Sequence, residues 1–133
     1  MKFLEKYNNS KNIRFKSFEE TLKISLNRGF KTIVETGTAR GKTKFFFIKR
    51  YNWKDGMSTP MFAEYAKFTM GKLHTCDISS KNIENAKKFT SNFSEYIKFY
   101  VKDSLIFLKE FNHPIDLLYL DSLDGHDPIA ASN

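Results

Sequence analysis

Apolar and polar positions along the chain follow two periods, one typical of helices and one typical of buried strands. In residues 17–28, SFEETLKISLNR, apolar side chains recur close to a helical stripe, with Ser17 as a candidate N-cap and Gly29 just past the end. The β-branched run KTIVET, residues 31–36, then ends in polar and glycine residues, which is typical of a buried strand. The chain is therefore predicted to begin with a helix and a strand.

The same alternation continues along the rest of the chain. Further strands are predicted at residues 73–78, 96–103 and 114–121, and helices at 80–93 and 104–111. The last strand, PIDLLYLD, is almost entirely apolar, so we expect both of its faces to be covered. Strands that alternate with helices form right-handed βαβ units. The pattern predicts an α/β fold, a three-layer sandwich around a mostly parallel sheet.

The length of the chain, 133 residues, is that of one domain, and no internal repeat or low-complexity linker divides it. We take residues 1–133 as a single domain. No uncharged run approaches the roughly 18 residues of a membrane-spanning helix, and the charged start MKFLEKYNNSKN is unlike a signal peptide. The lone Cys76 lies in an apolar run and is interpreted as a core residue. These features predict a cytoplasmic protein with no membrane partner.

Positive charge is concentrated in the first part of the chain. Residues 1–50 hold 13 Lys and Arg against 4 acids, a charge of +9, whereas residues 51–133 hold 9 against 11, a charge of −2. A basic surface can bind nucleic acid. However, the joint enrichment in Lys, Asn, Ile, Phe and Tyr is also what an AT-rich genome imposes, and no zinc-finger spacing or RNP motif is present. We therefore do not expect nucleic acid as a partner.

The stretch VETGTARGKT, residues 34–43, admits two interpretations. A phosphate-binding P-loop requires four residues between its glycines, so that the loop wraps the phosphate, but Gly37 and Gly41 are separated by three. The dinucleotide pattern G-x-G-x-x-G fails as well, because Ala39 occupies its second glycine position. The likeness of GKT to a P-loop is therefore interpreted as coincidence, and a P-loop NTPase is rejected.

What remains is an acid-x-Gly triplet, ETG at residues 35–37, at the end of the first strand. In open α/β sheets, an acid about 20 positions beyond the glycine-rich turn binds ribose hydroxyls from the end of the second strand. Asp77 lies 21 residues after Gly56 but 36 residues after Gly41. The spacing indicates that the glycine turn is split and that Gly56 belongs to it.

The first crossover helix is then predicted to begin near Ser58. Ser58 or Thr59 can cap a helix, and Pro60 suits its first turn. Residues 38–57 become an inserted loop rich in basic and aromatic side chains. Long loops in compact domains are often functional. This one suits either a lid over a ligand or a solvated excursion whose aromatic residues pack on the core.

In their order and spacing these residues resemble the class I S-adenosylmethionine-dependent methyltransferases. The resemblance extends from about residue 30 to residue 124. It rests on IVETGT and DGMST as the split glycine motif, TCDIS as the second-strand acid, VKDS as the third and DLLYLD as the fourth. The family resemblance implies a Rossmann-like fold with strand order 3-2-1-4 and S-adenosylmethionine as the cofactor.

The resemblance also implies which residues bind the cofactor, most of them at strand ends. They are Glu35, Thr36, Gly37, Thr38, Gly56, Ser58, Asp77, Ile78, Asp103, Ser104 and Asp121. Glu35 would orient the loop or meet the amino group of the methionine part. Asp77 would accept hydrogen bonds from the ribose hydroxyls beside Ile78, and Asp103 would lie near the adenine edge. Asp103 also has a simpler role available, because it can cap the helix that follows it.

The segment DSLDGHDP places four oxygen or imidazole ligands close together, at Asp121, Asp124, His126 and Asp127. Such a set can hold a divalent metal. D-G and D-P are also ordinary turn signals. We favour the turn and assign no metal, and we name Asp121 and His126 as candidate catalytic residues, with His126 as a candidate general base.

The chain ends just after the fourth predicted strand, whereas the family sheet continues, so the later strands are missing. A fragment, a degenerate gene, or a small protein that completes its sheet by homo-oligomerising would each account for this. The fourth strand would otherwise be an exposed apolar edge. The predicted function is methyl transfer to a small-molecule or sugar hydroxyl. The alternatives are a non-catalytic module that binds S-adenosylmethionine or a nucleotide, and a truncated, inactive fragment.

Overall fold

The computed structural model describes residues 1–10, 12, 14–37 and 58–120. Its centre is a sheet in which all strand pairs are parallel and the order is β3-β2-β1-β4. The strands are β1 (Thr32–Thr36), β2 (Lys72–Asp77), β3 (Ile97–Val101) and β4 (Leu117–Leu120). The fold is α/β and Rossmann-like, with the strand order predicted from the sequence.

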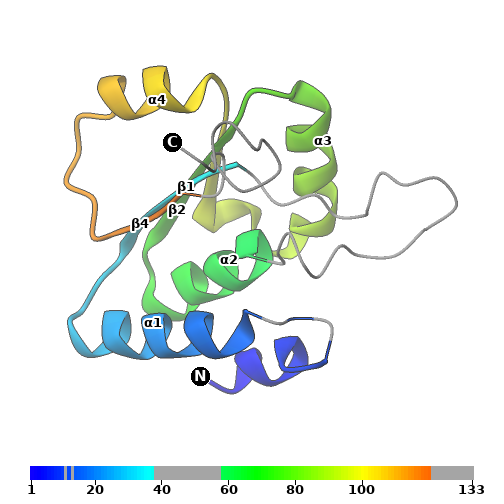
Figure 1. The fold of residues 1–133 in the computed structure, drawn as a ribbon, viewed down its shortest axis with the longest axis vertical. Helices are drawn as coiled ribbons and strands as arrows, with labels where there is room; N and C mark the ends of the chain where they lie inside the picture. Colours follow the sequence, from blue (N-terminus) through cyan, green and yellow to red (C-terminus); the bar gives the residue numbers. More distant parts are fainter. Residues whose placement is uncertain (11, 13, 38–57, 121–133) are drawn as a thin grey trace, which may run out of the picture.

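Helices flank the sheet on both sides, with α1 and α2 on one side and α4 on the other (Figure 1). The helix α2 packs on β1 and β2, α3 packs on β2 and β3, and α4 packs on β2. The helical elements are η1 (Lys2–Tyr7), α1 (Phe15–Asn27), α2 (Ser58–Thr69), α3 (Ser80–Phe89), η2 (Ser91–Tyr96) and α4 (Ser104–Glu110). Within the ranges that the structure describes, no helix is both long enough and apolar enough to cross a membrane.

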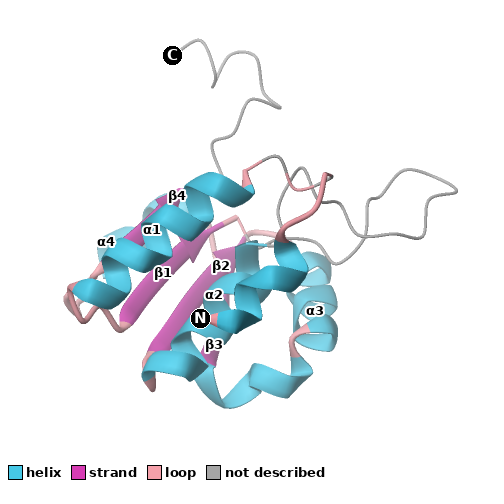
Figure 2. Cartoon of the chain, turned by 90° about the horizontal axis from the view of Figure 1, so that it is seen from below, coloured by secondary structure: helices cyan, strands magenta, loops and turns pink. Residues whose placement is uncertain are grey.

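Figure 2 shows the strands and the helices around them from below. Two apolar clusters of side chains lie between the sheet and these helices. On the α2 side, Ile33 and Leu73 of the sheet pack with Phe62 and Tyr65, and all four side chains are almost completely buried. On the α4 side, the buried cluster consists of Val34, Cys76 and Phe107. The burial of Cys76 confirms its assignment to the core.

The first helix begins earlier than predicted. Its N-cap is Arg14, without a side-chain hydrogen bond, so Ser17 lies inside the helix and the prediction that it is the cap is wrong. Phe15 and Phe18 are both buried. Residues three apart lie on the same face of a helix, so a helix that already includes Phe15 places both rings in the core, which accounts for the earlier start. Gly29 follows the helix with a φ of 70°, as a C-terminal glycine is expected to.

Several further predicted elements are shorter in the structure, including the strand predicted at 96–103, which extends from Ile97 to Val101. The helix predicted at residues 80–93 ends at Phe89, where the Thr90 hydroxyl donates to the carbonyl of Ala86 and the chain continues into η2. The strand predicted at 114–121 begins at Leu117. The expectation that both of its faces are covered is wrong, because α4 packs on β2 and leaves alternate residues of β4 exposed.

Candidate functional site

The carboxyl ends of β1, β2 and β3 meet at one edge of the sheet. Gly37, which follows β1, has a φ of 85°, a conformation that glycine adopts without steric cost. Its N–H donates to the carbonyl of Cys76 at 2.8 Å, and the N–H of Lys102 donates to the carbonyl of Asp77 at 3.1 Å. The backbone therefore holds three strand ends in fixed register, and the candidate acids of the sequence lie on or beside them.

Glu35 of β1 is completely buried and accepts hydrogen bonds from three hydroxyl groups. Thr59 and Thr75 donate to its Oε1 at 2.7 Å and 2.8 Å, and Ser58 donates to its Oε2. Ser58 and Thr59 open α2, and Thr75 belongs to β2. Glu35 thus ties the first turn of α2 to two neighbouring strands. Of the two roles expected for it, this geometry supports orienting the loop.

Burial raises the pKa of Glu35, and the three hydroxyl donors oppose that rise by stabilising the carboxylate. The nearby charge of Asp77 raises the pKa further. Since Glu35, Thr36 and Ser58 are buried, they are not open to a ligand, whereas Gly37 is partly exposed. The hydroxyl of Ser58 is used instead as a hydrogen-bond donor to Glu35.

Asp77 ends β2 with a partly exposed side chain. Its Oδ1 accepts from the N–H of Ser79 at 2.8 Å, while the amide of Asn82 lies 3.3 Å from both carboxylate oxygens. The N-cap of α3 is Ser79, so Asp77 is not needed as a cap. Among the residues that the structure describes, its Oδ2 has only the long contact with Asn82, and it keeps acceptor capacity for a ligand hydroxyl.

Asp103 is the N-cap of α4. Its Oδ2 accepts from the N–H groups of Leu105 at 3.0 Å and Ile106 at 3.2 Å, which is the capping role that the sequence left open. Both bonds use the same oxygen, so the other carboxylate oxygen keeps its acceptor capacity. Ser104 is the first residue of α4 and is partly exposed.

Burial and the charges of these three acids raise the pKa of the Cys76 thiol. Burial is the main cause that raises the pKa of Cys76 to about 12, and the charges of Asp77, Glu35 and Asp103 add to it. The thiol is therefore protonated at neutral pH and is a poor nucleophile. The carboxylates near Cys76 also make the end of β2 a region of negative charge, where a cationic ligand would be favoured.

Exposed apolar side chains lie next to the two accessible acids. Ile78, directly after Asp77, is 72% exposed, and Leu105 and Ile106, after Asp103, are also more than half exposed. Apolar groups beside partly exposed carboxylates suit a ligand with a flat apolar part and hydroxyl groups.

The structure brings together Glu35, Thr36, Gly37, Asp77 and Asp103 at one edge of the sheet, with their immediate neighbours Ser58, Ile78 and Ser104. The remaining candidates lie outside the described residues: Thr38, Gly56, Asp121 and His126, together with the metal ligands considered above, Asp124 and Asp127. The predicted loop at 38–57 also lies outside the described residues. Over residues 1–10, 12, 14–37 and 58–120, no three His, Cys, Asp or Glu side chains are grouped as metal ligands would be.

Sequence reasoning missed four residues of this edge, Thr75, Asn82, Leu105 and Ile106. A signal for the last two was present, because SLIFLKEF carries more apolar residues than one face of a short helix can bury. No comparable signal marks Thr75 or Asn82, whose importance comes from contacts with Glu35 and Asp77. Comparison with known proteins adds no assignment, since neither a protein-family model nor a curated protein matches this chain.

Proposed function

We propose that the chain binds S-adenosylmethionine and is the cofactor-binding part of a class I methyltransferase. The observation that carries this proposal is the placement of Gly37, Asp77 and Asp103 at the carboxyl ends of β1, β2 and β3. The strand order reverses between β1 and β4, and ligands of open α/β sheets bind outside the carboxyl ends of the strands at such a switch point.

The donor set at this edge fits the chemistry of the cofactor. S-adenosylmethionine is cationic at its sulfonium and amino groups, and it would supply an electrophilic methyl group. The acids around Cys76 give this edge negative charge. Asp77 would accept hydrogen bonds from the ribose hydroxyls through Oδ2, and the exposed Ile78 and Leu105 would cover an adenine face. Glu35 would hold α2 and β1 in place without touching the ligand.

For the acceptor, we propose a small-molecule or sugar hydroxyl. Transfer to a hydroxyl requires alignment of the oxygen with the methyl carbon and removal of its proton, for which Asp121 and His126 remain the candidates. We further propose a cytoplasmic location, since the single cysteine is a buried, protonated thiol. A second copy that covers β4 is the proposed oligomeric partner.

Calorimetric titration of the purified chain with S-adenosylmethionine, S-adenosylhomocysteine and ATP tests the proposal. We expect both sulfur compounds to bind and ATP not to bind. A folded chain that binds none of them contradicts the proposal. If the cofactor binds but no methyl group reaches any of a panel of small hydroxyl compounds, the chain is a binding module and the enzymatic part of the proposal fails.

Substitution of Asp77 then tests the placement of the ribose. Asp77→Ala should weaken binding by about 1.5–3 kcal/mol, the range for hydrogen bonds to a charged group. Glu84→Ala is the matched control, because Glu84 is an exposed acid of α3 whose carboxylate lies 3.8 Å from Nζ of Lys87 on the same helix. Equal affinity in the Asp77 variant and the control would show that the cofactor is placed wrongly.

A further inference from the structure

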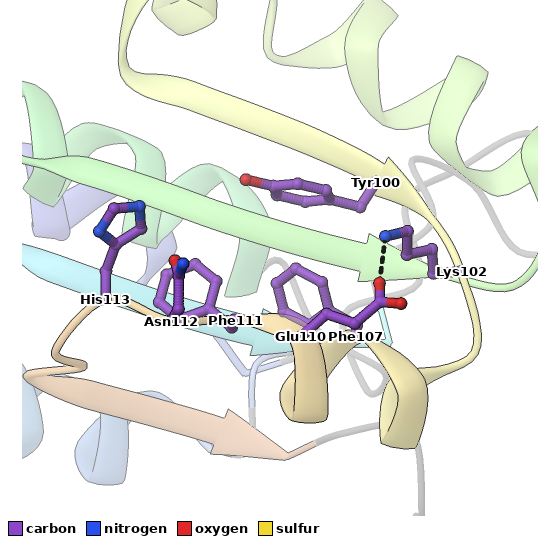
Figure 3. Close-up of a pocket in the computed structure, with 7 residues that line it drawn as sticks. All are labelled: Tyr100, Lys102, Phe107, Glu110, Phe111, Asn112 and His113. Atoms are coloured by element: carbon purple, nitrogen blue, oxygen red, sulfur yellow. Dashed lines mark hydrogen bonds and ion pairs between the residues drawn. The ribbon is translucent and has the colours of Figure 1, made fainter.

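A pocket separate from the candidate cofactor residues lies between α4 and β3, and its volume is about 140 Å³. Figure 3 shows the ring of Tyr100 on the sheet side of this pocket and Phe107 and Phe111 on the other side. An engineered protein cavity of about 150 Å³ binds benzene. The pocket therefore has the size to hold one aromatic ring.

The aromatic lining has the geometry of interacting rings. The centroids of Tyr100 and Phe107 are 4.7 Å apart with an interplanar angle of 49°, and those of Phe107 and Phe111 are 5.6 Å apart at 50°. Tilted pairs at such distances are favourable for aromatic rings. A further ring placed against Tyr100 and Phe111 would extend the same kind of contact.

One end of the pocket is polar. Asn112 and His113 line it there, and the hydroxyl of Tyr100 points toward the same end (Figure 3). Both Asn112 and His113 are exposed, and in the part of the chain that the structure describes neither side chain makes a hydrogen bond. The Tyr100 hydroxyl lies 3.0 Å from Nδ1 of His74. An amide and an imidazole thus face the pocket with their hydrogen-bonding capacity unused.

The positive charge next to the pocket comes from Lys98 of β3. In the lining itself, Nζ of Lys102 lies 2.5 Å from the carboxylate of Glu110, so these two charges compensate each other. Nζ of Lys98 lies 5.9 Å from the centroid of the Tyr100 ring. Burial, followed by the charge of Lys98, lowers the pKa of His74 to about 4. An anionic group would be favoured over a cationic one in these surroundings.

We propose that this pocket binds a small aromatic carboxylate. The ring would lie against Tyr100 and Phe111, and the carboxylate would accept hydrogen bonds from Asn112 and His113 at the polar end. None of the candidate cofactor residues lines the pocket, so this inference stands independently of the proposed function.

Benzoate is the probe that tests the proposal, with binding followed by calorimetry and by amide chemical shifts of the whole chain. Benzyl alcohol keeps the ring without the charge, and acetate keeps the charge without the ring. We expect benzoate to bind at least about tenfold more tightly than either, since both the ring and a charge-assisted hydrogen bond contribute. The largest shift changes should fall on Asn112 and His113.

Three variants locate the binding. Asn112→Phe places a ring in the pocket from an exposed position, so the fold is retained while benzoate is excluded. Asn92→Phe makes the same change at an exposed position of η2 outside the pocket and should leave affinity unchanged. His113→Ala should weaken binding by about tenfold, the loss of one charge-assisted hydrogen bond.

The proposal is overturned if benzoate fails to bind the folded parent chain, or if benzyl alcohol binds as tightly as benzoate. It is also overturned if Asn112→Phe and Asn92→Phe bind benzoate equally well. Exclusion by Asn112→Phe alone, with the preference for the carboxylate, supports it.

Discussion

The two faces of the sheet are covered to different depths. On the face that carries Ile33 and Leu73, α1 and α2 bury a large cluster of aromatic and aliphatic side chains. On the opposite face, within the described residues, the short helix α4 covers Val34 and Cys76, a pocket lies between α4 and β3, and Leu120 of β4 is about half exposed. The difference indicates that stability resides mainly on the α2 face, whereas the α4 face is open to ligands or partners.

Truncating one aromatic ring on each face gives the strongest test of this comparison. Phe62→Ala should lower the free energy of unfolding by about 3–5 kcal/mol, because the ring is almost completely buried in the larger cluster. Phe107→Ala should cost about 2–3 kcal/mol, near the transfer free energy alone, because water can enter from the adjoining pocket. Urea unfolding measures both values. Equal losses would show that the two faces contribute alike.

The buried acid of the α2 face gives the next largest effect. Glu35→Ala removes the acceptor of three hydroxyl groups and should cost about 3 kcal/mol, since an unsatisfied buried donor costs about 1–3 kcal/mol. Glu35→Gln keeps an acceptor oxygen and should cost less. Stabilities of the two variants in urea at neutral pH compare these losses, and a Gln variant as unstable as the Ala variant would contradict the role of Glu35 as acceptor.

The same Glu35→Gln variant has an expected pH dependence. Because the folded-state pKa of Glu35 is raised above 4.5, the folded chain retains a proton that the unfolded chain has released, and stability falls as pH rises above 4.5 toward the folded pKa. Glu35→Gln should remove this decline. Unfolding curves recorded across that pH range test it, and an unchanged slope would mean that Glu35 does not titrate with folding.

His74 lies on the α4 face, and its contribution to the pH dependence of stability should have the opposite sign to that of Glu35. Its pKa is lowered from 6.5 to about 4, first by burial and then by Lys98, so the unfolded chain binds the proton more readily. Stability should fall as pH decreases from about 6.5 to about 4. His74→Gln should flatten this decline. Thermal unfolding of the parent chain and of His74→Gln at a series of pH values tests this, and an unchanged slope in the variant would contradict it.

The smallest effect is expected on the exposed residues of β4. Leu118 is 42% exposed, so Leu118→Thr should change the free energy of unfolding by about 0.5 kcal/mol or less. A much larger loss that depends on protein concentration would show that a second copy covers this face. Light scattering on the parent and the variant provides the independent measure of oligomeric state.

The fold was predictable because its signal is local. Each strand is a short apolar run and each helix an amphipathic one, so alternation along the chain was enough to predict the parallel sheet, whereas its strand order was expected from the family resemblance. The ends of elements were less predictable, since the start of α1 depends on burial of Phe15 and the end of α3 on a side-chain bond of Thr90. Such contacts form only in the folded chain.

The sequence allowed us to predict which residues lie at the strand ends of the candidate site, but not which residues contact one another there. The positions of Gly37, Asp77 and Asp103 follow from the strands that precede them. The partners of Glu35 come from α2 and β2, which are distant in sequence, so no pattern identifies Thr75 as a donor. The exposure of Leu118 likewise depends on where α4 packs, which apolar periodicity does not encode.

The position of β1 in the sheet has a consequence for hydrogen exchange in deuterated solvent. Strand β1 lies between β2 and β4, so a neighbouring strand faces its N–H groups on either side. Within the described sheet, β4 has a neighbour on one side only, and N–H groups alternate in direction along a strand. Amides of β1 should therefore exchange uniformly slowly, whereas slow and fast amides should alternate along β4, and a second chain pairing at that edge would slow the fast ones.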